Sequence, residues 1–499
     1  MSRHFPLYFM VFMLLAMTVA SCNKKDEPSA STDSEYSSYS NSTTLVSAFS
    51  LRANTKIING LDSVTFAIDQ ERGLIYNADS LPYGTRINAL CVNVTTASTV
   101  ATKEFVVKNG TVQKDTVITY RNNSSDSIDF TGDVTLRVTS RDGLHTRDYK
   151  VKVNVHKQEP DIIVWNQASR RDLPNVSSTL IASKTVMVNG DFMCLVNDNG
   201  SYVLSTSEDP LAGTWSKTVI SFPFVPKVSS FTVTPQALYI LDEVGGLYSS
   251  DNNGASWTPC GVEWNTIIGA YNDRILGVKH DGTTWVHDEY PRREGFVPTK
   301  INDLFPVSGM SDLVMASNEW TANQQAMCAG GVLATGELTN AVWGYDGETW
   351  GLVSDISGVL PALSDATLFS YYTYSKTSTS ASPVKRVTWM VVGGKLADGK
   401  LNPTTFVSRN QGINWSWGED GVQLPATMPA FSGAQIFVMD RTISASAPRL
   451  NAYDAGHVTP VTEWDCSYLY LFGGYGANGS ALNNVWEGVL RRLTYKPVF

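Results

Sequence analysis

The residue with the clearest chemical role is Cys22. It follows Val19-Ala20-Ser21, small side chains that suit a signal peptidase, and an apolar run over residues 7–20 that is short for a membrane span. A cysteine here supplies the thiol nucleophile that accepts diacylglycerol in bacterial lipoproteins. We predict lipidation at Cys22, which would anchor the mature chain to a membrane. The alternative is an ordinary secretory cleavage site with an incidental cysteine.

The residues after Cys22 bear on location. Asn23 stands where an Asp would retain a lipoprotein in the inner membrane. Lys24-Lys25-Asp26-Glu27 resembles the Lys-then-acidic export signal of Bacteroidota-type lipoproteins, although a solvated tether is the alternative. We therefore expect a lipid-anchored protein of the outer membrane that faces the cell exterior.

Catalytic motifs are missing from the sequence. Sialidases carry an Arg-Ile-Pro motif, and the nearest stretch is Arg170-Arg171-Asp172-Leu173-Pro174, in which Asp172 interrupts the pattern. The turn Asp251-Asn252-Asn253 offers too few oxygens to bind calcium by itself. Three histidines beyond residue 160 do not lie beside the Tyr-Cys constellation of a copper-radical oxidase: His280, His287 and His457. We expect no catalytic residues, metal or cofactor.

Aromatic side chains are plentiful, with 13 Trp, 21 Tyr and 19 Phe. Most should be core residues, but some lie in Ser/Gly/Asn-rich stretches that suggest exposed loops, where they would stack on sugar rings or anchor a protein. The candidate ligand-binding aromatics are Tyr371, Tyr372, Tyr374, Trp417 and Tyr475.

Composition excludes some partners. The net charge is −9 and basic residues are not clustered, which argues against nucleic acid. The five cysteines other than Cys22 are scattered, so we predict no disulfide framework. Cys194 and Cys328 lie in apolar runs and should be core residues.

The first predicted domain is a strand-rich segment over residues 44–156. Apolar residues alternate with polar ones over residues 134–139 and 149–155, and the turn dipeptide Asp142-Gly143 between them predicts a hairpin. Further strands are predicted at Val64–Asp69, Leu74–Tyr76, Ala89–Thr95, Glu104–Val107 and Asp115–Thr119. This density of short strands indicates an immunoglobulin-like sandwich.

A repeat organises residues 161–499. Three apolar strands run into a Gly-Gly pair and are followed by an aromatic strand; the pairs are Gly330-Gly331, Gly393-Gly394 and Gly473-Gly474. Six tryptophans close repeating units: Trp215, Trp257, Trp285, Trp350, Trp415 and Trp486. Beyond a linker at residues 157–160, we therefore predict a β-propeller of about six blades, and an all-β fold class for the whole protein.

Two turns are similar to the Asp-box of sialidase-type propellers. They span Ser250–Trp257 and Ser408–Trp415, with Asn252 and Asn410 in place of Asp. Asn can make the same turn bonds, and Gly in the motif permits a positive φ. The motif is structural and gives no evidence for an enzyme. The Gly-Gly stretches resemble kelch repeats instead.

Several stretches of the first segment resemble one family. They are Phe66–Gln70, Ile75–Thr85, Ser127–Phe130, and Asp142-Gly143 with Arg147–Tyr149. The family is an uncharacterised group of Bacteroidota lipoproteins with an N-terminal β-sandwich and a C-terminal propeller. The resemblance covers almost the whole mature chain and implies a fold, but the family is itself known as a domain of unknown function.

These observations predict a signal peptide at residues 1–21, a tether at 22–43, and then the sandwich and the propeller. The expected function is non-enzymatic binding of a glycan or an envelope protein at the cell surface. The alternative is a glycan-active, sialidase-like hydrolase with its site at the propeller axis, and a third possibility is a passive part of an envelope complex. Convergent buried Arg, Glu, Asp and Tyr at the axis would favour the enzyme, and small or apolar residues the binder.

Overall fold

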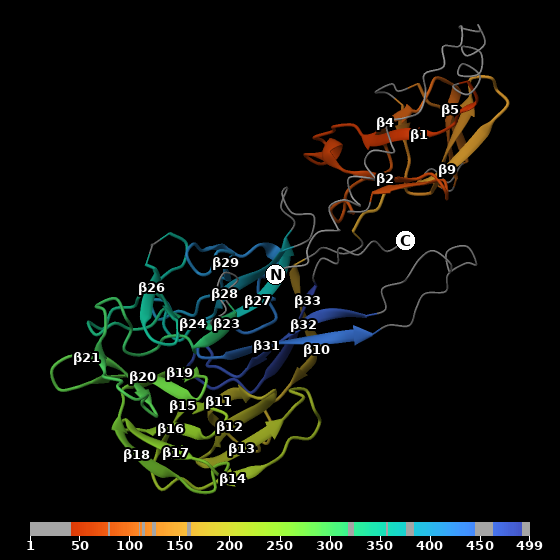
Figure 1. The fold of residues 1–499 in the computed structure, drawn as a ribbon. Coiled ribbons are helices and arrows are strands. Elements are labelled where there is room, and N and C mark those ends of the chain that lie inside the picture. The colour runs from red at the N-terminus through yellow and green to blue at the C-terminus, as the bar shows by residue number, and fades with distance from the viewer. Residues whose placement is uncertain are drawn as a thin grey trace, which may run out of the picture. The chain divides into compact units, whose positions relative to one another are not determined.

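The chain forms two compact units, Met1–Lys157 and Gln158–Phe499. The computed structural model describes residues 41–77, 80–108, 110–111, 115–121, 126–156, 161–317, 324–355, 358–375, 384–444 and 463–491. In the described ranges the regular secondary structure of both units is almost entirely β-strand (Figure 1). The predicted all-β fold class is confirmed.

The first unit contains two sheets. One has the strand order β1 (Val46–Leu51), β4 (Leu90–Thr96), β7 (Ser127–Ile128). The other has the order β2 (Phe66–Asp69), β3 (Leu74–Asn77), β9 (Thr146–Lys152), β8 (Asp133–Ser140), β5 (Val100–Lys108), β6 (Thr116–Thr119). The strands predicted from alternation are present, and β3 and β9 run parallel.

The core of this unit follows from the period-2 pattern. In β8, Val134, Leu136 and Val138 are buried, and the hairpin to β9 turns at Gly143 with φ +73°. Tyr149 of β9 is fully buried, and its hydroxyl accepts the N–H of Val46 at 3.2 Å. That bond ties the six-stranded sheet to β1 in the other sheet, so the unit is a sandwich.

The second unit is a six-bladed propeller. Five blades are continuous in sequence. The first contains β11 (Leu180–Val188), β12 (Asp191–Asp198), β13 (Ser201–Ser207) and β14 (Thr218–Ile220), and the second contains β15 (Pro226–Val233), β16 (Leu238–Asp242), β17 (Gly246–Ser250) and β18 (Thr258–Glu263). The third contains β19 (Thr266–Tyr271), β20 (Arg274–His280), β21 (Trp285–Tyr290) and β22 (Thr299–Lys300), the fourth β23 (Val314–Ser317), β24 (Gln324–Ala329), β25 (Val342–Tyr345) and β26 (Trp350–Ser354), and the fifth β27 (Thr367–Ser375), β28 (Val384–Val392), β29 (Phe406–Ser408) and β30 (Ser416–Trp417).

The sixth blade joins the two ends of this unit. It has the order β10 (Ile162–Arg171), β33 (Val485–Arg491), β32 (Glu463–Phe472), β31 (Gln435–Ser444). Because β10 precedes the first blade yet pairs with β33, backbone hydrogen bonds close the ring. We count the strands of the sixth blade from β31, so that the first strands of the six blades are β11, β15, β19, β23, β27 and β31. The first strands of successive blades lie next to one another around the centre (Figure 1).

The repeat signals mark equivalent places in the blades. All six glycines of the Gly-Gly pairs have positive φ, and each pair follows the second strand of its blade. Each of the six closing tryptophans belongs to a different blade, so the predicted blade number is confirmed. Trp285 and Trp486 lie in the third strands of their blades, whereas Trp350 begins an outermost strand.

The two Asp-box-like turns form the predicted bonds. Asn252 Oδ1 accepts the N–H of Ser256 at 3.0 Å, and Asn410 Oδ1 accepts the N–H of Asn414 at 2.9 Å. Gly254 has φ +85° and the equivalent glycine of the second turn has +82°. Asn therefore replaces Asp without loss of the turn.

Candidate functional site

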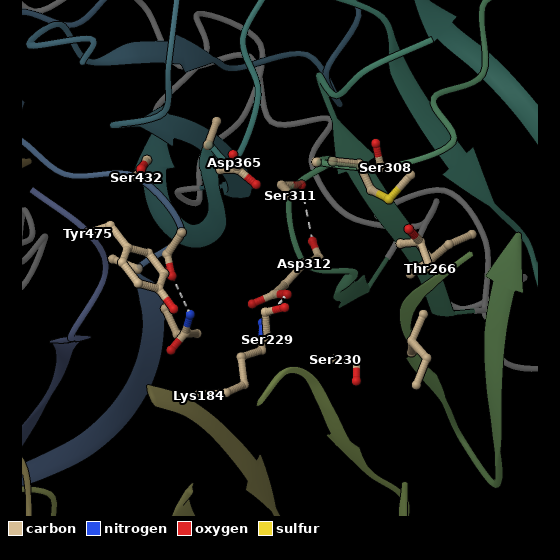
Figure 2. A pocket seen from close by; sticks show the side chains of 18 of the residues that line it. Lys184, Ser229, Ser230, Thr266, Ser308, Ser311, Asp312, Asp365, Ser432 and Tyr475 are labelled. Atoms are coloured by element: carbon tan, nitrogen blue, oxygen red, sulfur yellow. Dashed lines mark hydrogen bonds and ion pairs between the residues drawn. The ribbon is translucent and has the colours of Figure 1, made fainter. Parts of the chain in front are cut away.

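A cavity of about 440 Å³ lies at the centre of the propeller, and we call it the axial pocket (Figure 2). Every blade contributes to its wall. The polar lining residues, in blade order, are Ser183 and Lys184; Lys227, Ser229 and Ser230; Thr266; Ser308, Ser311 and Asp312; Asp365 and Lys395; Ser432, Gln435 and Tyr475.

The Gly-Gly pairs position part of this wall. The residue that follows each pair is Val332, Lys395 or Tyr475, and all three line the pocket. Each forms an isolated β-bridge with a serine that precedes a first strand: Ser308 with Val332, Ser364 with Lys395, and Ser432 with Tyr475. The paired glycines permit this approach because a Cβ on Gly331 would lie 2.5 Å from Pro306.

The residue after each bridging serine has a left-handed backbone. Gly309 has φ 61°, Asp365 has φ 52° and Gly433 has φ 63°. Two of the three blades use glycine, which adopts this conformation without cost, whereas a non-glycine residue loses about 1 kcal/mol. Asp365 is therefore a mildly strained residue on the pocket wall.

Charges in the pocket are arranged in pairs. Lys184 forms an ion pair with Asp312, and Lys395 lies 3.6 Å from Asp365. The side chains of Asp312 and Asp365 remain 50% and 40% exposed. Lys227 donates to the carbonyl of Asn265 at 3.3 Å. Both carboxylates are thus accessible to a molecule in the pocket.

Other hydroxyl groups of the wall hold the backbone in place. Ser230 donates to the carbonyl of Lys227 at 2.7 Å, and the buried Ser311 accepts the N–H of Ala329 at 3.0 Å. Burial, and to a smaller extent the negative charge of Asp365, raise the pKa of the Tyr475 phenol. Tyr475 therefore offers a neutral ring and hydroxyl to the pocket.

The ionisable side chains of this wall are aspartates, lysines and one tyrosine. Among the described lining residues there is no Arg, Glu or His, and both aspartates have a lysine partner. Within the described parts of the chain, no group of three His, Cys, Asp or Glu could hold a metal ion. Of the four residue types whose convergence at the axis would favour the enzyme alternative, the described lining contains Asp (Asp312 and Asp365) and Tyr (Tyr475) but neither Arg nor Glu.

A second cavity, of about 740 Å³, lies between the third and fourth blades. Beside it, β21 buries two carboxylates against four cations, a group that we call the β21 cluster: Asp288, Glu289, Arg274, Lys279, Arg292 and Arg293. Lys279 and Arg292 each lie 2.8 Å from Asp288. Burial alone would raise the pKa of Asp288, but these hydrogen bonds and one from Trp264 lower it below its ordinary value.

Both units match family models. Residues 159–498 match the DUF6242 beta propeller domain, and residues 38–153 match the N-terminal domain of DUF6242, a domain of unknown function. The chain belongs to the DUF6242 family. A comparison with curated proteins found no match.

This DUF6242 chain is similar to several solved structures at low identity. The six-bladed Aleuria aurantia lectin is 12% identical, with 62% of this chain and 91% of that chain covered and a TM-score of 0.32. The endo-arabinase from Bacteroides thetaiotaomicron VPI-5482 is also 12% identical, with 66% and 97% covered and a TM-score of 0.29. YCF48 from Cyanidioschyzon merolae is 10% identical, with 71% and 91% covered and a TM-score of 0.29.

The structure separates the candidate aromatics of this DUF6242 chain. Tyr475 lines the axial pocket, and Trp417 is 63% exposed at the end of the fifth blade. Tyr371 was expected in an exposed loop, which is wrong: it lies in β27 and is buried, because that strand packs against the sixth blade. Tyr372 is half-buried with the Lys385 ammonium 3.8 Å from its ring centre. The side chain of Tyr374 lies outside the described part of the structure.

Cys22 also lies outside the described residues, so its lipidation stays a prediction. In the described ranges, no helix is long and apolar enough to cross a membrane. Cys194 and Cys328 are fully buried, as predicted.

Sequence reasoning missed Asp312, Asp365 and the lysines of the DUF6242 axial pocket. Lys395 could have been found, because aligning the three Gly-Gly pairs puts it at the position equivalent to Tyr475, which was chosen as a candidate. No motif marks Asp365, since the bridging serine and its neighbour form too short a pattern to stand out.

Proposed function

We propose that this DUF6242 protein is a lipid-anchored binding module of the outer membrane, facing the cell exterior, that holds part of a glycan in its axial pocket without cleaving it. The observation that carries the proposal is the wall of that pocket. Lys395, Asp365 and Tyr475 provide a donor, an acceptor and an aromatic surface, which are the groups that sugar hydroxyls and sugar ring faces require.

The size of the pocket supports the same function. A volume of about 440 Å³ lies in the range of small-molecule sites and suits one or two sugar rings. The anchor rests on the sequence alone, through the small residues before Cys22 and the charged residues after it. Trp417 is an exposed aromatic that offers a secondary contact for a longer chain.

A glycan array is the test of binding. The full-length protein, kept in mild detergent, would be applied to the array, and recovered sugars would be analysed by mass spectrometry. We expect retention of an unchanged sugar. A cleaved sugar would favour the hydrolase alternative, and silence on the array together with one stoichiometric co-purifying protein would favour an envelope partner.

Two matched lysine variants locate the site. Lys395 and Lys400 belong to the same blade and each pairs with an aspartate, but only Lys395 lines the pocket, and Lys400 is 80% exposed. Lys395→Met should weaken glycan binding at least about 10-fold, as expected for loss of a charged hydrogen bond. Lys400→Met should leave the affinity unchanged. Equal effects would place the binding site elsewhere.

The anchor has its own test. In cells, Cys22→Ser should prevent lipidation and release the protein from the detergent phase, while its fold and glycan affinity stay the same. A variant that still partitions into detergent would contradict the lipid anchor without affecting the binding proposal.

A further inference from the structure

Three equivalent turns face the axial pocket, and one of them differs in chemistry. The turns are Ser308-Gly309 with Val332, Ser364-Asp365 with Lys395, and Ser432-Gly433 with Tyr475. Of these three, the fifth blade alone carries a charge at both variable positions. It also places a non-glycine residue where its neighbours have glycine in the left-handed region.

The architecture of the turn does not need the Asp365 side chain. Asp365 donates its backbone N–H to the carbonyl of Gly309 at 2.6 Å, and its carbonyl accepts the N–H of Gly433 at 2.7 Å. A glycine at position 365 would form both bonds and would relieve the strained backbone. The fold requires the left-handed conformation at this position but not a non-glycine residue, and a residue that keeps such strain is typical of functional positions.

The carboxylate of Asp365 is placed for contact with a ligand. It is 40% exposed, it lines the cavity, and its partner Lys395 is 44% exposed at 3.6 Å. Figure 2 shows Asp365 and Tyr475 on the wall of the same pocket, from adjacent blades. A loose, half-exposed pair of this kind can exchange its partner for a ligand with little loss, because its own interaction is weak.

Building on the glycan-binding function proposed above, we propose that Asp365, Lys395 and Tyr475 select the ligand, and that the ligand presents two adjacent free hydroxyls on a sugar ring. The two carboxylate oxygens of Asp365 accept one hydrogen bond from each hydroxyl, and Lys395 donates to an oxygen of the same ring. The ring of Tyr475 packs against the apolar face of the sugar.

Calorimetric titration of the full-length protein tests this assignment. The probes are the methyl glycosides of glucose, galactose, mannose and fucose, each with deoxy analogues that lack one hydroxyl. We expect at least one glycoside to bind, and a deoxy analogue that breaks the hydroxyl pair to bind at least about 10-fold more weakly. Asp365→Gly should weaken the parent glycoside at least about 10-fold and remove the difference between parent and analogue.

Stability measurements make the test specific. The thermal unfolding midpoint of Asp365→Gly should not fall, because the strained turn is relaxed. Asp365→Asn, which keeps the side-chain shape and also tolerates the left-handed backbone, should weaken binding without preventing folding. An unchanged affinity in both variants would overturn the assignment of Asp365 and leave the glycan proposal intact. If wild type bound none of the glycosides and nothing on the array, the glycan function would be overturned as well.

Discussion

Two regions of the propeller pair aspartate with basic side chains, and they do so in opposite environments. In the β21 cluster, Asp288 is fully buried and has two basic partners at 2.8 Å. In the axial pocket, Asp365 is 40% exposed and its one lysine lies 3.6 Å away. The pairs of Asp288 in the β21 cluster therefore stabilise the fold. The Asp365–Lys395 pair in the axial pocket is open to solvent and can exchange its partner for another molecule.

The difference follows from the cost of desolvation. A carboxylate removed from water must be matched by ionic and hydrogen-bond partners, and loss of one partner leaves an uncompensated charge. Asp288 meets this demand with Lys279, Arg292 and the indole N–H of Trp264 at 3.1 Å. Asp365 stays hydrated, so its pair contributes little to stability and can be replaced by ligand hydroxyls.

The largest expected effect comes from the same isosteric change in the two regions. Asp288→Asn leaves Lys279 and Arg292 without a countercharge and should lower the free energy of unfolding of the propeller by about 3–5 kcal/mol. Asp365→Asn should change it by less than about 1 kcal/mol. All 13 tryptophans lie beyond residue 160, so tryptophan fluorescence in urea reports on this unit alone. Similar losses in both variants would mean that the axial pair is structural.

A second prediction concerns acid sensitivity next to the β21 cluster. His287 is 7% exposed, with Trp350 stacked at 5.4 Å and Phe305 edge-on at 4.3 Å. Burial lowers the pKa of its imidazole from 6.5 to about 4. Below pH 6.5 the imidazole of the unfolded chain binds a proton, whereas the buried imidazole stays neutral down to about pH 4. His287 therefore does not reduce the free energy of unfolding above pH 6.5, and it reduces it progressively as the pH falls from 6.5 toward 4.

Between pH 7 and pH 5 this loss should amount to about 2 kcal/mol. His287→Phe should remove it, so the unfolding free energy of the variant should depend less on pH than that of wild type. His280→Phe is the control, because His280 is exposed in the same blade. An equal pH dependence of wild type and His287→Phe would show that His287 does not titrate as its burial implies.

The sequence allowed the ring of blades to be predicted because its determinants are local and repeated. A Gly-Gly pair after an apolar strand recurs in three blades and a closing tryptophan in all six, and the hairpin at Asp142-Gly143 follows from alternation within a few residues. Tyr475 was found as a candidate because it is an aromatic residue in a Gly/Asn/Ser-rich stretch of the kind that forms exposed loops.

The two charged regions were not predictable in the same way. Trp285–Tyr290 contains His287, Asp288 and Glu289 in succession, three polar residues whose burial no local pattern indicates. All three are buried because the strand lies within a junction between blades. Their basic partners come from β20 and from the loop after β21, and only the fold brings them together. The prediction that Tyr371 lies in an exposed loop was wrong for the converse reason. An aromatic stretch with polar neighbours forms an inner strand of the fifth blade.

The smallest expected effect compares the equivalent turns of the axial pocket. Asp365→Gly should leave the unfolding free energy unchanged or raise it by up to about 1 kcal/mol, because relief of the left-handed backbone is partly offset by the greater freedom of glycine in the unfolded chain. Gly433→Asp should lower it by about 1 kcal/mol, since a Cβ at Gly433 meets nothing closer than the Tyr475 ring at 3.6 Å and adds only backbone strain.

Urea unfolding of both variants and of the double exchange measures this balance. The double exchange moves the carboxylate to the next blade and should return the stability to near that of wild type, while glycan affinity stays low because Lys395 no longer has its acidic neighbour. A loss of more than about 1 kcal/mol in Asp365→Gly would show that the side chain supports the turn. Asp365 would then resemble Asp288, and its strained backbone would reflect folding rather than ligand selection.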